Sequence, residues 1–521
     1  MISVSNGWKE MHEKLLLPES FIEISVGVGD TTVYDSVTAS ATNEAIFSNT
    51  GKVVRNVSTI TPANYATLET NLWSLDGSRN LIPDSEPYDT PGYVSSDDSE
   101  IKLVLSFPEV RENPIPGFTI DWSSEFDEYP TTFTIEAKSG DTVVGSVTVE
   151  NNKSSSSTVD MELTSYDRVE ITVSDWINPD RRKRIDLVTF GHVLTFDKAS
   201  KQSGIMSFSH EQHGDLNSGE LPKNSIEFAL DNTDGRWNPS NPTGDGRYLS
   251  ERQVVTVSYG LLVNGKKEWI SAGRFYLSEW RAPSNGMEGY FVARDVFEYM
   301  LNTPYTGILT GTLSELVEAA LALADIPEDC VVNVDSCLDN YTATLKADHK
   351  YTVAEVIQLS ANASGCVIWQ DRSGALNIAP LNRELSDFTI TSLVSYLHPE
   401  VELSKPLKAI SVSYGDPDSE EEGAGGKYVL NVGESGETQT VENPLVATEA
   451  QATEIAEWVR NTHKSRQTIK GEFRADPRLD LFDVVTVESK YGTISPVAIT
   501  NIKYNYTGSF RATYTGRVIS G

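Results

Sequence analysis

Over most of its length, this chain alternates hydrophobic and polar positions with the period of β-strands. Within residues 221–280, strand-like apolar runs are separated by polar turns rich in Gly, Pro and Asn. The Asn264-Gly265 pair predicts a tight hairpin, because both central residues of such a turn need φ > 0. No catalytic motif interrupts this region, which therefore indicates a scaffold built from strands.

Helical spacing of apolar residues marks three further segments. The first begins at the capping box of Thr312 with Glu315 and is expected to end before residue 327. The second begins at the box of Thr352 with Glu355 and should stop at Gly365. The third covers residues 448–463. Between the last two helices, a hairpin around residues 371–374 is predicted, so residues 306–385 are expected to form a small α/β domain.

A composition shift sets residues 27–183 apart from the rest. This stretch is rich in Ser, Thr, Asp and Val, with many turns and no sustained helical period. It interrupts strands expected at residues 15–26 and 184–196, so we interpret it as an inserted all-β module. The whole chain, at 521 residues, exceeds the roughly 250 to 300 residues at which single cores stop growing, so three to four domains are expected.

Charge and reactive residues narrow the classes of function. A net charge of −33 argues against a surface that grips phosphate, because nucleic-acid binding requires Lys and Arg. The three cysteines have no CxxC pair, so free buried thiols are expected rather than a disulfide framework or a zinc site. The sequence has neither a signal peptide nor a run of about 18 apolar residues, so no membrane-spanning segment is expected.

Candidate chemistry is sparse. The motif from His210 to His213 (HEQH) has its histidines at i and i+3 in a strand context, whereas zinc proteases need i and i+4 on a helix. No nucleophile elbow, phosphate loop or dinucleotide fingerprint is present. We therefore predict no catalytic residues, no cofactor and no metal, and we expect the protein not to be an enzyme. A carboxylate pair brought together only by folding would not show in the sequence.

Two groups of motifs occur in a telling order. The segments LPKNSIEFALDNTDGRWNP, RYLSERQVVTVSYG and GRFYLSEW come first, and ADPRLDLFDVVTVESKYG with GSFRATYTGR closes the chain. The first group resembles the first barrel, and the second group the second barrel, of the tail-tip or baseplate hub proteins of tailed bacteriophages (late control protein D-like). The resemblance implies a mainly β chain with an α+β part. Residues 1–26 and 184–305 would form the first barrel, 306–385 the α/β domain, and 386–521 the second barrel with one helix at about 448–463.

The same resemblance implies a function and partners. Three copies with two barrels each would form a pseudo-sixfold ring that joins the tail tube to the distal tip and lines the DNA channel. The expected partners are two further copies and neighbouring tail proteins (distal tail ring, tube, tip or fibre proteins), with DNA only in transit. The protein would be made in the bacterial host cytoplasm and would reside in the virion. Its acidity would then either keep DNA from sticking to the channel wall or simply favour solubility.

The inserted module contains, in order, the segments GFTIDW, TTFTIEAKSGDTVVGSVTV and VEITVSDWINPDRRKRIDLVTFG. In this order the module at residues 27–183 resembles the galactose-binding-like (discoidin-type) β-sandwich. The resemblance implies contact with host-surface glycan, and docking of a neighbouring protein is the alternative. Sugar sites combine aromatic faces with nearby carboxylates. Such rings are also common core residues. Rival hypotheses are a carbohydrate-binding protein and a polysaccharide hydrolase acting on the bacterial envelope. The candidate glycan-binding residues are Asp121, Trp122, Glu125, Asp127, Tyr129 and Trp176.

Overall fold

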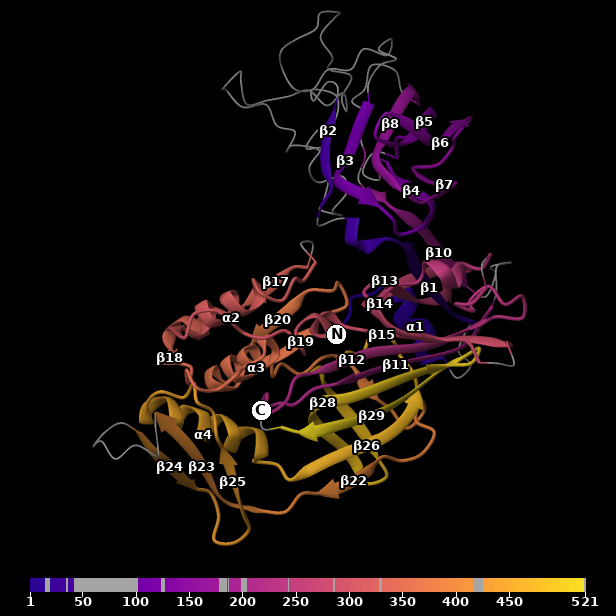
Figure 1. The fold of residues 1–521 in the computed structure, drawn as a ribbon. Helices are drawn as coiled ribbons and strands as arrows, with labels where there is room; N and C mark the ends of the chain where they lie inside the picture. The colour runs from indigo at the N-terminus through magenta and orange to yellow at the C-terminus, as the bar shows by residue number, and fades with distance from the viewer. Residues whose placement is uncertain are drawn as a thin grey trace, which may run out of the picture. The chain divides into compact units, whose positions relative to one another are not determined.

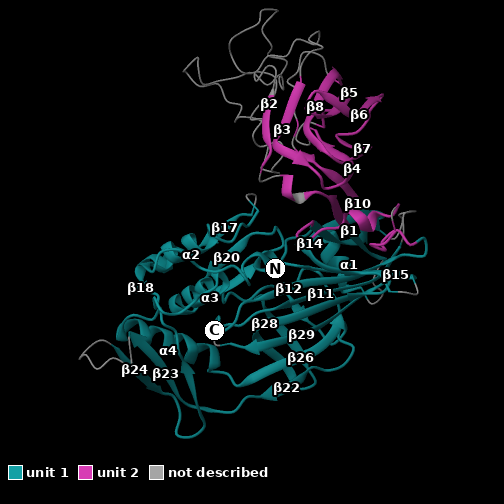
Figure 2. Ribbon diagram, in the orientation of Figure 1, with its two compact units in different colours: residues 1–24, 195–234, 254–521 teal, residues 25–194, 235–253 magenta. Residues whose placement is uncertain are grey.

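The computed structural model describes twelve stretches of the chain, which fold into a mainly β protein (Figure 1). They divide into two compact units (Figure 2). Unit 1 contains residues 1–24, 195–234 and 254–521, and unit 2 contains residues 25–194 and 235–253. The described residues are 1–14, 19–33, 36–41, 102–122, 127–177, 185, 187–197, 204–241, 243–283, 286–327, 330–415 and 425–519.

One long sheet dominates unit 1. Its path runs β10-β1-β13-β14-β15-β12-β11-β28-β29-β26-β22, with β27 also paired to β28 and β21 to β27. The strands are β1 (Ser20–Gly29), β10 (Gly191–Asp197), β11 (Ile205–His213), β12 (Lys223–Asp231), β13 (Val254–Val263), β14 (Lys266–Arg281), β15 (Glu288–Arg294), β21 (Thr389–Ile390), β22 (Glu400–Leu403), β26 (Gln467–Arg474), β27 (Val484–Ser489), β28 (Gly492–Tyr506) and β29 (Phe510–Val518).

The junction between β11 and β28 joins the two strand sets that the sequence assigned to separate barrels. These strands pair antiparallel, with His210 opposite Tyr504. Strands β11 to β15 and β26 to β29 therefore belong to one continuous sheet. The predicted hairpin at Asn264-Gly265 is confirmed, since it connects β13 to β14 and both residues have positive φ, at 50° and 82°.

The predicted helices of the α/β region are present. Helices α2 (Leu313–Leu321) and α3 (Val353–Ser364) both begin with complete capping boxes, and α3 ends at Gly365 with φ 71°. Helix α2 ends at Leu321. Two small sheets accompany the helices: β16 (Thr310–Thr312) with β18 (Thr342–Thr344), and β17 (Val332–Val334), β20 (Leu376–Ala379) and β19 (Val367–Gln370). The short 3-10 helices within the described residues are η1 (Thr31–Val33), η3 (Asp245–Tyr248), η4 (Val296–Tyr299) and η5 (Ser336–Asn340).

A third small sheet shares the core of this α/β region. Strands β23 (Leu407–Gly415), β24 (Gly425–Asn431) and β25 (Glu437–Val441) form it, and α4 (Glu449–His463) follows. The apolar face of α4 and the buried side of β23, including Ile410 and Ile455, join the same hydrophobic cluster as α2 and α3. The sequence predicted that residues 386–521, including this helix, form the second barrel. In the structure, the apolar face of α4 packs with α2 and α3 rather than with the long sheet.

An N-terminal helix was not predicted. Helix α1 (Asn6–Glu13) has Ser5 as its N-cap, whose side chain accepts a hydrogen bond from Trp8 N at 3.0 Å. Trp8 is buried and stacks on His12. Its sequence, NGWKEMHE, is mostly polar, so the apolar period is too weak to detect.

The described residues of unit 2 form two sheets that enclose one aromatic-rich core. The first sheet has the order β2-β3-β8-β5-β6 and the second β7-β4-β9. The core includes Phe118, Phe133 and Tyr166. The strands are β2 (Thr38–Ala41), β3 (Lys102–Arg111), β4 (Ile115–Asp121), β5 (Pro130–Ser139), β6 (Thr142–Glu150), β7 (Ser156–Leu163), β8 (Tyr166–Trp176) and β9 (Leu187–Thr189).

Candidate functional site

The long sheet encloses a row of buried polar side chains beside its junction. His210 on β11, Tyr259 on β13 and Tyr504 on β28 are all fully buried. Nδ1 of His210 lies 2.6 Å from the Tyr259 hydroxyl, and Nε2 lies 2.7 Å from Oδ1 of Asn224. The Tyr504 hydroxyl donates to the carbonyl of Leu479 at 2.5 Å. The ring of Tyr504 lies 6.1 Å from that of His210 and 5.6 Å from that of Tyr259, so the three aromatic side chains form one buried cluster that spans both strand sets.

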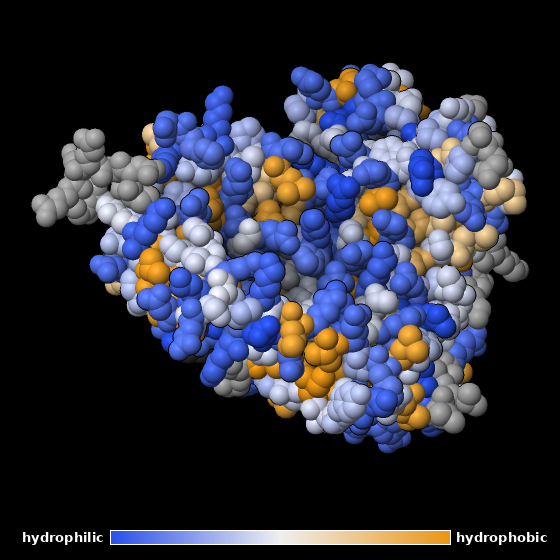
Figure 3. All heavy atoms as spheres, turned by 90° about the horizontal axis from the view of Figure 1, so that it is seen from below, coloured by the Kyte–Doolittle hydropathy of each residue, from blue (hydrophilic) through white to orange (hydrophobic). Residues whose placement is uncertain are grey.

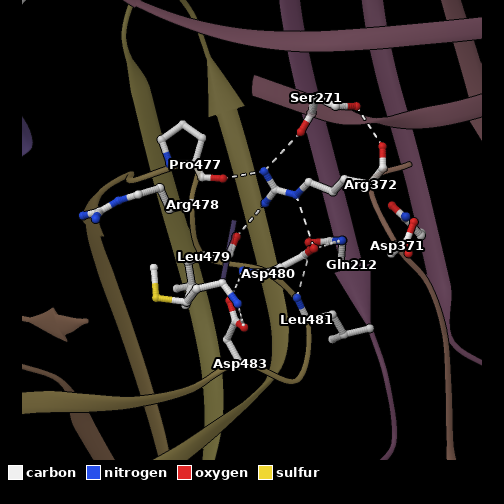
Figure 4. Close-up of polar contacts among 12 residues, drawn as sticks. Gln212, Ser271, Asp371, Arg372, Pro477, Arg478, Leu479, Asp480, Leu481 and Asp483 are labelled. Carbon is white, nitrogen blue, oxygen red and sulfur yellow. Dashed lines mark hydrogen bonds and ion pairs between the residues drawn. The ribbon is translucent and has the colours of Figure 1, made fainter. Parts of the chain in front are cut away.

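Arg372, in the hairpin between β19 and β20, packs beside this cluster. Figure 4 shows its polar contacts: Nη2 donates to the carbonyl of Leu479 at 2.6 Å, and Nη1 donates to the carbonyl of Pro477. The guanidinium carbon lies 5.8 Å from the ring centre of Tyr259 and 6.0 Å from that of Tyr504. A planar guanidinium suits this position, because its several fixed donors can satisfy carbonyl groups that radiate from a loop.

Asp480 is the acidic partner of Arg372. Its Oδ2 lies 3.4 Å from Nε of Arg372, and its Oδ1 accepts from Nε2 of Gln212 at 2.7 Å and from Leu481 N at 3.0 Å. The loop is tightened by a bond from Asp480 N to Oδ2 of Asp483 at 2.8 Å. Asp483 also forms an ion pair with the N-terminal ammonium of the chain. The residues from 477 to 483 therefore bind the hairpin, β11 and the N-terminus at once.

The protonation states of the cluster follow from burial. Burial, and after it the charge of Arg372, lowers the pKa of His210 to about 4. Burial also raises the pKa values of Tyr259 and Tyr504 well above their ordinary value. At neutral pH the histidine and both tyrosines are therefore uncharged, while Arg372 is a cation beside the carboxylate of Asp480. Because these groups are buried and have partners, we interpret Arg372, Asp480 and the loop at residues 477–483 as a structural clamp. The clamp joins the hairpin between β19 and β20 to the long sheet.

The clamp was not found from the sequence. The hairpin at residues 371–374 was predicted, but nothing in its four residues distinguishes Arg372 from an exposed turn arginine. One sequence signal could have indicated the clamp. In the segment LDLFD, at residues 479–483, two aspartates stand among apolar residues, and a buried carboxylate such as that of Asp480 requires a cationic partner.

The HEQH motif does not form a metal site. Side chains alternate along β11, so His210 and Gln212 point into the core while Glu211 and His213 point outward. Glu211 pairs with Lys503 at 3.0 Å, and His213 lies 2.8 Å from Glu220. Within the described parts of the chain, no group of three or more His, Cys, Asp or Glu side chains could hold a metal ion.

The residues predicted to bind glycan converge at one end of the unit 2 sandwich. The end of β4 meets the start of β7, and the start of β5 meets the end of β8. Asp127 is exposed and accepts from the Ser155 hydroxyl at 3.1 Å. Asp121 and Tyr129 are half-buried. Glu125 lies outside the described residues.

The two tryptophans of that set differ in exposure. Trp122 has 0% exposure, packs edge-on against Phe133, and donates from Nε1 to the Ser157 hydroxyl at 2.9 Å. It is a core residue, and its ring offers a sugar no stacking face, which corrects the expectation for this position. Trp176 is half-buried, and its Nε1 donates to Glu128 at 3.3 Å. Glycan binding stays a prediction, now centred on Trp176, Tyr129 and Asp127.

Unit 1 also contains an open cleft of about 510 Å³ between α3 and the small sheet of β23 and β24. Its rim carries charges of both signs, among them Lys346, Glu355 and Lys427. On its floor, Nδ2 of Asn443 donates to the carbonyl of Leu359 at 2.8 Å. The floor amide is therefore engaged within the protein and does not select a ligand class.

Comparison of this chain with solved structures finds similar phage tail proteins. No protein-family profile matches the sequence. No curated protein matches it either. Among solved structures, the 43 kDa tail protein of prophage MuSo2 from Shewanella oneidensis is 11% identical with a TM-score of 0.44, over 62% of this chain and 95% of that one.

Two further structures are similar to this chain at the same level. A tail protein from Neisseria meningitidis is 11% identical with a TM-score of 0.42, over 60% of this chain and 92% of that one. A prophage tail protein from Listeria monocytogenes is 9% identical with a TM-score of 0.41, over 62% of this chain and 92% of that one.

In the described part of the chain, none of the helices is both long and apolar enough to cross a bilayer.

Proposed function

We propose that this chain is a structural component of a phage tail tip, a hub that joins the tail tube to the distal tip. The pairing of β11 with β28 is the observation that carries the proposal. It merges the two segments that resemble hub barrels into one wall of strands, with His210 opposite Tyr504 at the junction. The Arg372–Asp480 pair fastens the α/β region to that wall. A rigid wall of this kind suits a load-bearing part of a particle.

We further propose that three copies assemble into the hub ring and that the ring surrounds the DNA path. The net charge of −33 supports a wall that does not retain DNA, because like charges remove the attraction to phosphate. Genome passage needs such a surface, whereas a DNA-binding protein would need the opposite charge.

The edge strand β22 supports a contact between copies. It pairs with β26 on one side and ends the sheet on the other within the described residues. Val401 lies opposite the buried Ile469, yet 43% of Val401 and 65% of Leu403 are exposed, as is 75% of the nearby Leu397. An unpaired edge with apolar side chains favours pairing with another strand.

A second copy of this chain is the occupant we propose for that edge. Within the described residues, the same sheet ends at β10 on its other side, so every copy carries two unlike edges. Pairing of unlike edges is head to tail, and such contacts close into rings when the rotation permits.

Hydrophobic patches also interrupt the mostly hydrophilic face drawn in Figure 3, and such patches mark interaction sites when they are large. The exposed apolar residues of the segment before and within β22 are Leu385, Leu393, Tyr396, Leu397, Val401 and Leu403.

The test is the mass and shape of the purified chain. Light scattering over a range of concentrations should give three times the chain mass, and negative-stain images should show a ring with a central channel. Leu397→Lys combined with Leu403→Lys should give monomers that keep the wild-type circular dichroism. The matched control Val144→Lys, at a 43% exposed apolar position in unit 2, should stay trimeric. A monomeric wild type without a ring at any concentration would contradict the proposal.

The unit 2 sandwich gives a second, subordinate proposal: contact with host-surface glycan. Tyr129 and Trp176 are partly exposed aromatic side chains, and Asp127, two residues before Tyr129, is an exposed carboxylate. This combination suits a pyranose, whose C–H face stacks on rings and whose hydroxyls bind carboxylates. Docking of a neighbouring tail protein is the competing outcome, and binding to isolated host envelopes distinguishes the two.

A further inference from the structure

Two of the three cysteines lie against each other in the α/β region. Sγ of Cys337, in η5, is 3.3 Å from Sγ of Cys366, which directly precedes β19. A disulfide bond is about 2.05 Å long, so the two sulfur atoms are in contact without being bonded. Cys366 is fully buried, and Cys337 is half-buried.

Both backbones are held in place by local caps. The side chain of Asp335 caps η5 and accepts from Cys337 N at 2.9 Å. Cys366 N donates to the carbonyl of Ala361 at 2.9 Å, just after Gly365 ends α3. The contact between the sulfur atoms therefore results from two fixed chain positions and not from a loose loop.

The surroundings keep both groups as thiols. Burial raises the pKa of Cys337, and the neighbouring thiol and Asp335 raise it further. Burial also raises the pKa of Cys366. Because the thiolate is the reactive form, both cysteines react slowly at neutral pH and faster as the pH rises.

We propose that Cys337 and Cys366 form an intramolecular disulfide when the protein meets an oxidising environment that contains small-molecule disulfides. The accessible Cys337 thiolate attacks the small disulfide, forming a mixed disulfide and releasing one thiolate. The Cys366 thiolate then attacks Sγ of Cys337 and displaces the second thiolate. Two protons leave the protein thiols, and the two electrons reduce the small disulfide to two thiols.

The bond would change the stability of the α/β region in a predictable direction. It would close a loop from residue 337 to residue 366 that contains β18 and α3. Such a closure restricts the unfolded chain, so the oxidised protein should unfold at higher temperature or denaturant concentration than the reduced one. This inference does not depend on the proposed role as a hub.

Thiol counting on the full chain tests the proposal. The reduced protein is incubated with oxidised glutathione at pH 8.5 for a day, and its free thiols are then labelled with a maleimide in denaturant. We expect labelling to fall from three sites to one and peptide mapping to join the Cys337 and Cys366 peptides. Retention of three labelled thiols, a stable glutathione adduct on Cys337, or links between chains would overturn the proposal.

Two variants provide the controls. In Cys330→Ser, which keeps the pair, labelling should fall from two sites to none. In Cys337→Ser, labelling should stay at two sites, and the difference in unfolding midpoint between the oxidised and reduced protein should vanish. An equal shift of the midpoint in Cys337→Ser and the wild type would contradict the assignment, whatever the thiol count.

Discussion

Arg372, in the hairpin between β19 and β20, points its Nε at the Asp480 carboxylate across 3.4 Å, and both side chains are largely withdrawn from solvent. Removing one partner of such a pair leaves an uncompensated charge, which typically costs about 3 to 5 kcal/mol. We therefore expect Arg372→Met to lower the free energy of unfolding by roughly that amount. Urea denaturation followed by circular dichroism measures the change.

The matching control keeps the shape and removes both charges. Asp480→Asn combined with Arg372→Met should be less destabilised than Arg372→Met alone, because no unpaired charge remains. If the double variant lost as much unfolding free energy as Arg372→Met and Asp480→Asn lose together, the two residues would not be coupled.

Acid should weaken the fold through His210. Burial holds its folded-state pKa at about 4, below the 6.5 of an unperturbed histidine. Between these values the unfolded chain binds a proton that the folded chain does not, so stability is complete above pH 6.5 and falls as the pH drops toward 4. At roughly 1.4 kcal/mol per pKa unit the loss is on the order of 3 kcal/mol.

Urea midpoints measured from pH 7.5 to 4.5 test this dependence. His210→Gln should flatten the slope relative to the wild type, although His463, whose pKa burial also lowers to about 4, should keep part of it. His398→Gln replaces an exposed histidine and serves as the control, with the wild-type slope expected. A slope unchanged by His210→Gln would rule out this residue as a source.

Substitutions of Trp122 and Trp176 should separate the stability of the sandwich from its recognition of a ligand. Trp122→Ala empties a fully buried site and should destabilise the sandwich by about 3 to 5 kcal/mol. Trp176→Ala removes a half-buried ring and should weaken binding to host envelopes with a smaller loss of thermal stability. Envelope binding that is unaffected by Trp176→Ala and by Tyr129→Ala would remove the glycan proposal.

The N-cap of α3 should contribute measurably to the α/β region. The Thr352 hydroxyl accepts from Glu355 N at 3.2 Å, and the Glu355 carboxylate accepts from Thr352 N at 2.7 Å. Thr352→Ala should cost about 1 kcal/mol of unfolding free energy. Lys350→Ala, two residues earlier at an exposed position, should cost much less. Equal costs for the two variants would mean that the cap has no specific role.

The elements with strong local signals were predictable. The capping boxes at Thr312 and Thr352 and the hairpin at Asn264-Gly265 each depend on a few neighbouring residues, and all three are present. Helix α1 was missed because its apolar residues are too few to show a period. The pairing of β11 with β28 could not be derived, because register between distant strands depends on the whole folded chain.

The clamp and the unit 2 sandwich show that the roles of single residues were also hard to predict from the sequence. Arg372 becomes distinctive only when residues 477 to 480 are folded around it, since its partners are mostly backbone carbonyls. Trp122 and Trp176 have similar local sequence contexts, yet one is enclosed and the other is partly open. Burial is set by packing between strands, and the sequence pattern indicates only which face a residue occupies.

The junction of β11 with β28 has a consequence for synthesis on the ribosome. Glu211 and Lys503, which face each other across it, are separated by 292 residues in the chain. Since a cell adds about 5 to 20 residues per second, β11 waits many seconds for its partner. During this interval its hydrogen-bonding edge is open to other nascent chains. We expect the yield of native protein to depend on synthesis rate, temperature and chaperone supply more than on the stability of the finished fold.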